Sequence, residues 1–377
     1  MKHLGDICKI NGAEIEPVDC ITGGSPCQDL SIAGKRAGLA GERSGLFTEQ
    51  VRIVKEMRER DKRNGRTGDM VRPRFLVWEN VLGAFSSNGG GDFQTVLEEI
   101  INIAEPTVSV PRFEGKWTKA GAIDGDGWSV AWRTHDAQYW GVPQRRRRIS
   151  VVADFGGQSA GEILFERKSV SRHPTESGTA RERLAGNAES GASYADRIRG
   201  GCDGGGKGAL VQADKSGTLG TGNDQMTYQM QGFGGYREGN VASTCKQRDF
   251  KDGADLAITN MVVRRLTPME YERLQGFPDG WTDIGEWVDD DGRTHKQADS
   301  PRYKALGNSI ALPFWHWMFC RMAEHLPGKA TLGSLFDGIG GFPLCWESIH
   351  GKGTARWASE IEKFPIAVTK LRFPEEA

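Results

Sequence analysis

The sequence has no strong excess of charge of either sign. Its 377 residues include 49 Lys and Arg against 50 Asp and Glu, which gives a formal net charge of −1. Bulk charge therefore does not indicate a nucleic-acid partner, and any surface for such a partner must be local. A chain of this length can form one large or two moderate domains around a buried core.

Cysteine is sparse, and long apolar runs are missing. The seven cysteines are an odd number and include no Cys-x-x-Cys pair, which argues against a disulfide framework and against a zinc site. No signal segment opens the chain, and the apolar segment 312–322 is shorter than the roughly 18 residues that a membrane span needs. We therefore expect a soluble, cytoplasmic protein without a bound metal.

Glycine, by contrast, is abundant, with 51 residues, and it clusters between residues 156 and 260. This region is also rich in Ser, Thr and charged residues and shows no sustained helical period. Disorder is one interpretation of such a composition. We favour a small, loop-rich β domain, because Tyr228, Phe233, Tyr236 and Phe250 still offer a modest core.

In the rest of the chain, short apolar runs alternate with amphipathic stretches. Segments 46–60 and 93–104 carry apolar residues at helical spacing, which indicates helices. Strands alternating with helices predict an α/β fold with a doubly wound, mostly parallel sheet. The expected strands are 2–6, 19–22, 75–78, 128–132, 149–153, 331–336 and 356–359, and the further helices are 267–275, 309–326, 340–347 and 363–373.

One cysteine stands in a loop rather than inside an apolar run. Cys27 follows Pro26 in a glycine-rich segment after the expected strand 19–22, whereas Cys20 lies within that strand. A thiolate in such a loop can reach a substrate. A Pro-Cys pair after a strand is a weak signal by itself. It gains weight from Glu79, which follows a second expected strand, and from the segment 144–148 (Gln-Arg-Arg-Arg-Arg), which precedes a third.

With segments 303–309 (Tyr-Lys-Ala-Leu-Gly-Asn-Ser) and 336–342 (Phe-Asp-Gly-Ile-Gly-Gly-Phe), these motifs resemble those of the C5-cytosine DNA methyltransferases. The resemblance covers about two thirds of the chain. The family normally opens with the Phe-x-Gly-x-Gly segment, which here comes last. We therefore expect a circular permutation, with Ala377 and Met1 close together in the fold. The alternative is that the C-terminal piece is an unrelated appendage.

The resemblance also implies a domain organisation. Residues 1–155 would form the catalytic part, and residues 156–260 a target-recognition domain. Residues 261–326 would return to close the catalytic domain, and residues 331–377 would supply its cofactor-binding part.

The segment 336–341 is the expected cofactor site. Glycines after a strand let the backbone approach a ligand and expose the amides of the next helix, and Glu360 ends the following strand, where it can hold ribose hydroxyls. Pro343 occupies the place of the third glycine of the dinucleotide fingerprint, so that motif is excluded. The resemblance implies S-adenosylmethionine as the cofactor, bound by Phe336, Asp337, Gly338, Gly340, Gly341, Glu360, Asp6, Ile7, Pro26, Asn308 and Ser309. A helix cap is the alternative interpretation of Asn308.

The resemblance also assigns the chemistry. Cys27 would bond to C6 of cytosine and make C5 nucleophilic, while Glu79 would hydrogen-bond N3 and the amino group of the base. Arg146 and Arg148 would contact the base or stabilise the site, and their charge would lower the pKa of Cys27. The remaining cysteines are interpreted as structural: Cys8, Cys20, Cys202, Cys245, Cys320 and Cys345.

The expected partner is double-stranded DNA, from which the target base must be flipped out. The expected DNA contacts are Gln28, Ser31, Lys35, Arg36, Gln144 and Arg265. We expect a monomer, with a cognate restriction endonuclease as an optional partner. Two alternatives remain open, an RNA methyltransferase and a non-catalytic DNA-binding remnant. The long glycine-rich segment favours DNA over RNA.

Overall fold

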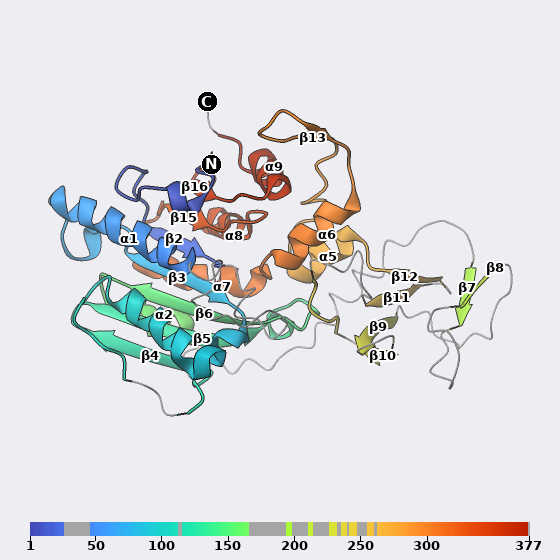
Figure 1. The fold of residues 1–377 in the computed structure, drawn as a ribbon, viewed down its shortest axis with the longest axis horizontal. Helices are drawn as coiled ribbons and strands as arrows, with labels where there is room; N and C mark the ends of the chain where they lie inside the picture. Colours follow the sequence, from blue (N-terminus) through green and yellow to red (C-terminus); the bar gives the residue numbers. More distant parts are fainter. Residues whose placement is uncertain are drawn as a thin grey trace.

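The structure is a computed structural model. It describes residues 1–25, 46–111, 115–165, 194–197, 210–213, 226–231, 235–239, 241–246, 255–259 and 262–375. An eight-stranded sheet in the order β1-β16-β15-β2-β3-β6-β5-β4 forms its centre (Figure 1). These strands are β1 (Lys2–His3), β2 (Cys20–Gly23), β3 (Phe75–Asn80), β4 (Ala120–Gly125), β5 (Trp128–Asp136), β6 (Arg147–Asp154), β15 (Leu332–Leu335) and β16 (Ala355–Ser359).

The sheet confirms the expected α/β fold with a mostly parallel, doubly wound sheet. The five strands from β1 to β3 are mutually parallel. β6, β5 and β4 follow as an antiparallel edge. β5 and β6 are antiparallel because only a short connection with the 3-10 helix η6 (Ala137–Tyr139) joins them, whereas parallel strands need a long crossover.

The sheet is buried on both faces, and β3 shows why. Phe75 and Val77 point into one hydrophobic cluster, whereas Leu76 and Trp78 point into the other, as the two-residue period of a strand dictates. The first cluster contains side chains of the helices α3 (Ala160–Leu164), α7 (Leu312–Met322), α8 (Gly341–His350) and α9 (Lys363–Arg372). The second contains those of α1 (Leu46–Arg63) and α2 (Gly91–Ile101).

The helix boundaries follow from local chemistry. The helix α5 (Pro268–Gln275) begins with a capping box between Thr267 and Glu270 and ends at Gly276, whose φ is +81°. α7 begins at Leu312, three residues later than expected, because Ser309 and Ala311 are extended and Pro313 fits the first helical turn. The helix α6 (Asp299–Asn308) was not expected from the sequence. The remaining 3-10 helices are η1 (Ile7–Lys9), η3 (Gly68–Met70), η4 (Leu82–Phe85), η5 (Ser87–Gly90) and η7 (Ala323–His325).

Smaller sheets are present in the glycine-rich region, as far as it is described. A four-stranded sheet has the order β10-β9-β11-β12 and lies beside α5 and α6 (Figure 1). Its strands are β9 (Met226–Gln231), β10 (Gly235–Gly239), β11 (Leu256–Thr259) and β12 (Val262–Arg265). The same region contains the strand pair of β7 (Tyr194–Arg197) and β8 (Leu210–Ala213). Another pair, β13 (Trp287–Val288) with β14 (Thr294–His295), lies later in the chain.

Segments from the beginning and the end of the sequence lie side by side (Figure 1). β15 and β16 occupy the space between β1 and β2 in the sheet. The amino group of Met1 donates to the carbonyl of Phe373 at 3.1 Å, and the amide of Leu4 donates to that of Ala358 at 2.8 Å. The first and last strands are therefore neighbours, as expected.

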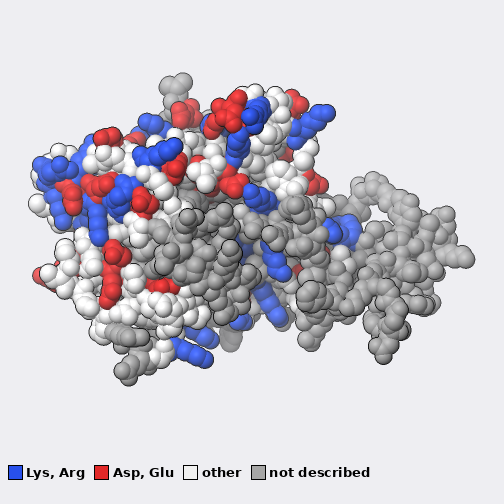
Figure 2. All heavy atoms as spheres, in the orientation of Figure 1, with Lys and Arg blue, Asp and Glu red and all other residues white. Residues whose placement is uncertain are grey.

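Positive and negative side chains are intermixed over the helices at the upper left of Figure 2, in line with the balanced composition. Among the described residues, every helix is too short or too polar to cross a lipid bilayer. The same part of the chain has no cluster of three or more His, Cys, Asp or Glu side chains suited to a metal ion.

Candidate active site

The expected motifs that the structure describes lie near the carboxyl ends of the parallel strands of the central sheet. Leu335 of β15 lies beside Gly23 of β2, which lies beside Trp78 of β3, so the segments after these parallel strands leave at the same edge. β6 runs in the opposite direction and therefore begins there, with Arg147. Neighbouring strands are about 4.8 Å apart, which separates the turn after β15 from the end of β3 by roughly 10 Å.

Glu79 and Arg148 form an ion pair at this edge. Glu79 Oε1 lies 2.9 Å from Arg148 Nε, and the two side chains are only 12% and 16% exposed. The second oxygen, Oε2, lies beside Gly24, where a Cβ atom would come within 3.0 Å of it. The arginine thus holds one oxygen of the carboxylate, and the glycine leaves room for the other.

Ser25 is fixed next to this pair. Its hydroxyl oxygen accepts from the indole N–H of Trp78 at 3.0 Å and from the amide of Asn80 at 3.2 Å. The Asn80 amide also donates to the Ser25 carbonyl at 3.3 Å. Ser25 is the last described residue before the loop with the expected nucleophile. Pro26, Cys27, Gln28, Ser31, Lys35 and Arg36 lie outside the described residues.

Arg146, which we expected to contact the base or to stabilise the site, binds backbone carbonyl groups. Its guanidinium donates to the carbonyl oxygens of Cys245 at 3.4 Å, of Gly307 at 3.3 Å, and of Ser309. Its backbone N–H donates to Asp136 Oδ1 at 3.1 Å. Arg146 is only 2% exposed. It connects the start of β6 to the segment that contains Cys245 and to the end of α6.

Gln144, which we expected to contact DNA, is instead fully buried. Its amide donates to the Cys245 sulfur at 3.1 Å and to the Leu274 carbonyl at 3.4 Å, because the backbone at 144 pairs with Ala242 and turns the side chain inward. Arg265, the other expected contact in the described chain, is exposed at the end of β12.

The turn after β15 contains three residues with positive φ, namely Phe336 (+54°), Gly338 (+57°) and Gly340 (+80°). The backbone N–H of Gly338 donates to Glu360 Oε2 at 2.8 Å. A Cβ on Gly340 would lie 2.6 Å from Phe373, whereas the Cβ position at Gly338 has no atom within 4 Å. The turn is therefore tightly packed at Gly340 and open at Gly338, as a ligand-binding turn requires.

Asp337 is buried within this turn, with 6% of the residue exposed. Its Oδ1 accepts from the Ser334 hydroxyl at 2.5 Å, and its Oδ2 has no hydrogen-bond partner among the described residues. Burial, and secondarily the charge of Glu360, raise the pKa of Asp337 to about 8.

The remaining expected cofactor residues lie around the turn. Glu360 Oε1 accepts from the amides of Ile361 and Glu362 at 2.7 and 2.8 Å, so the carboxylate keeps acceptor capacity for a hydroxyl group. Gly341 is packed against Ile310, which lies 2.8 Å from its Cβ position. Asp6 caps η1 by accepting from the Cys8 amide, Ile7 and Ser309 are buried, and Asn308 is exposed at the end of α6.

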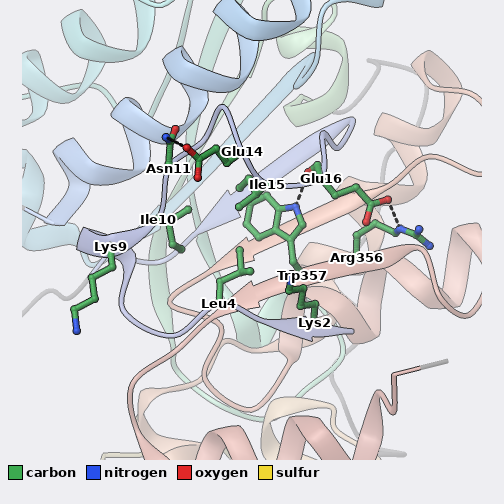
Figure 3. A pocket seen from close by; sticks show the side chains of 10 residues that line it. All are labelled: Lys2, Leu4, Lys9, Ile10, Asn11, Glu14, Ile15, Glu16, Arg356 and Trp357. Atoms are coloured by element: carbon green, nitrogen blue, oxygen red, sulfur yellow. Dashed lines mark hydrogen bonds and ion pairs between the residues drawn. The ribbon is translucent and has the colours of Figure 1, made fainter. Parts of the chain in front are cut away.

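A cavity of about 340 Å³ lies elsewhere, on the α1 side of the β1–β16 edge (Figure 3). The Trp357 indole closes one side and donates to the Glu16 carbonyl at 2.8 Å, while Arg356 pairs with the Glu16 side chain at 2.7 Å. None of its lining side chains carries a buried polar atom without a partner among the described residues. We therefore assign it no ligand.

Sequence reasoning missed several residues that shape the site. Ser25 and Asn80 hold the end of β2 against β3, Asp136 binds the backbone of Arg146, and Ser334 binds Asp337. The available signal was a polar residue at or near the end of a strand, because ligand sites of α/β sheets gather there.

Comparisons with known proteins identify the family of this chain. The sequence model of the C-5 cytosine-specific DNA methylase family matches residues 1–104 and 118–322. A DNA N-6-adenine-methyltransferase of Escherichia phage P1 is 30% identical over 85% of this chain and 55% of its own length. The type II methyltransferase M1.ScrFI of Lactococcus lactis is 27% identical over 85% of this chain and 66% of its own. The chain thus spans between about half and two thirds of these relatives.

Among solved structures, the Dnmt2 methyltransferase of S. pombe matches with a TM-score of 0.47 and 15% identity, covering 85% of this chain and 83% of its own. The family match covers most of the sequence, including the segments that carry Glu79, Arg146 and Arg148. The chain belongs to the C-5 cytosine-specific DNA methylase family.

Proposed function

We propose that this protein transfers a methyl group from S-adenosylmethionine to C5 of a flipped-out cytosine in a specific double-stranded DNA sequence, through a covalent bond between Cys27 and C6. The observation that supports it most is the mostly buried Glu79–Arg148 pair beside Ser25, which stands two residues before Cys27 in the sequence. Family membership supports DNA methylation in general.

The family and the fold imply an S-adenosylmethionine-type methyl donor, which supplies an electrophilic methyl group. The turn at Gly338 is suited to this donor, because the Cβ position of Gly338 is open. The Gly338 amide binds the Glu360 carboxylate, and the neighbouring Asp337 is buried. We propose Glu360 for the ribose hydroxyls, and the remaining turn residues, with Asp6, Ile7, Asn308 and Ser309, for the other parts of the donor.

The chemistry would proceed through this chain's own side chains. The Cys27 thiolate bonds to C6, and the electron pair that leaves the C5–C6 double bond spreads toward N3, where a proton held by the Glu79 carboxyl would be donated in a hydrogen bond. C5 would then take the methyl group, and the donor would leave as the uncharged thioether. Solvent water would take the C5 proton, and the electron pair of the C5–H bond would re-form the double bond and expel the thiolate. Arg148 would hold Glu79 Oε1, which leaves Oε2 for the base.

We further propose that residues 156–260 read the DNA sequence, that residues 1–155, 261–326 and 331–377 form one catalytic domain, and that this domain is circularly permuted. Two observations support the permutation. The family match stops at residue 322, and the strands β15 and β16, which follow that residue, lie between β1 and β2 in the sheet. A monomer that works in the cytoplasm, with or without a cognate endonuclease, is part of the same proposal.

Trapping on a duplex that contains 5-fluorocytosine tests the proposal. Fluorine at C5 cannot leave as a proton, so the Cys27–C6 bond should persist and give a denaturant-resistant complex that requires the methyl donor. Cys27→Ser should lose the complex, whereas Cys8→Ser, at an exposed cysteine, should keep it. If a complex formed only with an RNA duplex of equal length, the protein would be an RNA methyltransferase. If no complex formed with any DNA, the result would favour a non-catalytic DNA-binding remnant.

A second candidate is methylation of adenine N6, which is favoured by the similarity to the DNA N-6-adenine-methyltransferase of phage P1. An exocyclic amine attacks a methyl donor directly and needs no thiol. Mass spectrometry of nucleosides from methylated DNA separates the two. We expect 5-methylcytosine that disappears in Cys27→Ser, and N6-methyladenine that persists in this variant would overturn the cytosine assignment.

A further inference from the structure

The buried carboxyl group of Asp337 has no role in the chemistry described above. It lies inside the turn after β15, with one oxygen bound to Ser334 and the other, Oδ2, without a partner among the described residues. A buried polar atom usually finds a partner, so an unpaired carboxyl oxygen in a ligand-binding turn calls for a functional explanation.

We propose that Asp337 is a proton-coupled charge sensor: it holds a proton in the free protein and releases it when the positively charged methyl donor binds at the turn. The site then binds the sulfonium donor more tightly than the uncharged thioether product. This inference rests on the proposed function and adds to it a means of exchanging product for fresh donor.

The surroundings of Asp337 favour its neutral form in the free protein. Burial raises its pKa to about 8, the Glu360 charge adds to the rise, and the Ser334 hydrogen bond opposes it. Glu360, whose Oε2 accepts from the Gly338 amide, is a charged group that contacts the turn from the end of β16. Other described groups that pack on the turn are uncharged. They are the Trp281 indole, which donates to the Ile339 carbonyl at 2.8 Å, and the side chains of Ile310 and Phe373.

Charge distinguishes the donor from the product. The donor carries a sulfonium, an ammonium and a carboxylate group, for a net charge of +1, whereas the product lacks the sulfonium charge. A positive charge brought to a buried carboxyl lowers its pKa, so donor binding should release a proton. By linkage, donor affinity should rise with pH by at most about tenfold per unit until the free carboxyl ionises, near pH 8, and product affinity should rise less.

Calorimetry on the full chain tests this inference. Donor and product are titrated separately in buffers of different ionisation enthalpy, from about pH 6.5 to about pH 8.5. We expect wild type to release up to one proton on binding donor near neutral pH and a smaller fraction on binding product. Asp337→Asn, which keeps an acceptor for Ser334, should bind donor without this release and with a flat pH dependence.

Two further variants complete the design. Glu347→Gln changes another carboxyl with a raised pKa, bound to the Gly353 and Ala355 amides away from the turn, and should leave proton release unchanged. Ser334→Ala removes the hydrogen bond that lowers the pKa of Asp337 and should move the midpoint of proton release to higher pH. If Asp337→Asn fails to fold, the shift of this midpoint in Ser334→Ala tests the charge sensor in its place.

The outcomes separate this inference from the proposed function. Equal proton release by wild type and Asp337→Asn, or equal release for donor and product, overturns the charge sensor while the methyltransferase assignment stands. A wild-type chain that does not bind the donor at all overturns both.

Discussion

Two carboxyl groups at the same sheet edge are held in opposite ways. Glu79 is ion-paired with Arg148, whereas Asp337 is buried with a hydroxyl as its partner and Glu360 as a nearby like charge. The Arg148 guanidinium holds one Glu79 oxygen in place, whereas burial favours the neutral acid at Asp337. This contrast suits Glu79 to polarising a base and Asp337 to responding to a cation.

Glu79→Gln should lower the methylation rate by about 10²-fold or more and leave donor binding unchanged, because the amide keeps the shape but cannot transfer a proton to N3. Arg148→Met should also slow methylation, since it removes the partner of Glu79 Oε1. The measurement is transfer of a radiolabelled methyl group at saturating DNA. The matched control is Arg147→Met, at an exposed side chain paired with Asp136, and methylation by Glu79→Gln at the wild-type rate would contradict this role.

Asp337→Asn should change how stability depends on pH. The pKa of Asp337 is raised to about 8 in the folded chain, so between about pH 4 and pH 8 the folded state holds a proton that the unfolded state has lost. The free energy of unfolding of wild type therefore falls as pH rises through this window. Relative to wild type, the variant should gain on the order of several kcal/mol from about pH 4 to about pH 8.5. Thermal melts of both proteins check this, and a pH-independent difference would contradict it.

Sequence predicted best the positions of residues that belong to a recognisable motif. Glu79 and Arg148 lie together as the motifs imply. Gln144 belongs to the same motif, but its side chain is buried by an isolated bridge to Ala242, a contact between residues about a hundred positions apart that no local pattern encodes. The unpaired oxygen of Asp337 was unpredictable for the same reason, because burial is a property of the whole fold.

At the scale of elements, the β13–β14 hairpin fastens α9 to the rest of the domain. Asp289 Oδ2 accepts from Lys363 Nζ at 3.0 Å and lies 3.0 Å from His295 Nε2, and Trp287 stacks on the His295 ring at 4.2 Å between centroids. Lys363 is the first residue of α9, three positions after Glu360. The hairpin thus supports the end of the expected cofactor site.

Asp289→Ala should loosen this hairpin. Asp289 Oδ1 also accepts from the backbone amides of Asp291 and Arg293, so the substitution removes turn contacts as well as ion pairs. We expect trypsin to cleave after Arg293 at least about tenfold faster, because local opening becomes easier. Asp290→Ala, which removes only an exposed pair with Lys370, should change cleavage by less than about twofold. Equal cleavage of the two variants would show that Asp289 does not hold the turn.

The elements that periodicity predicted are those with a clear apolar pattern. α1, α2, β2, β3, β5 and β6 all lie within a few residues of the expected ranges. β1 is shorter than expected, because Gly5 has a φ of +70° and Asp6 caps η1. β4, α6 and the β13–β14 hairpin were missed, because none of them carries a sustained apolar period. β4 contains Gly121 and Gly125, α6 contains Pro301 and Gly307, and β13 and β14 have two residues each. In β4, β13 and β14, pairing with a neighbouring strand rather than propensity forms the element.

At the scale of the whole molecule, the order of the strands in the sheet differs from their order in the sequence. β15 pairs with β2, and β16 pairs with β1, so the last two strands are enclosed by the first two. The sequence predicted this arrangement, because a βαβα unit at residues 331–373 needs neighbouring strands to bury its edges. What it could not predict was the antiparallel edge of β6, β5 and β4, which depends on a connection too short for a crossover.

The adjacency of the chain ends predicts that the order of the two segments can be exchanged. A rearranged chain would begin at Lys329, run to Glu375, continue through a short Gly-Ser linker to Met1 and end at Pro327. The new junction is short because the Met1 amino group lies 3.1 Å from the Phe373 carbonyl, and the new opening falls at Gly328, an exposed residue with no atom within 4 Å of its Cβ position. We expect the rearranged chain to fold, to melt within about 5 °C of the original, and to bind the methyl donor equally well.

A chain joined in the same way but opened between Gly338 and Ile339 is the matched control. It breaks the turn in which the Gly338 amide binds Glu360 and the Ile339 carbonyl binds Trp281, so donor binding should be lost even where the fold survives. Circular dichroism, thermal melts and donor calorimetry on both chains check the prediction. If the chain opened at Gly328 were unfolded, or bound donor no better than the control, the two segments would depend on their order of connection. The sheet would then not be a single domain whose sequence is permuted.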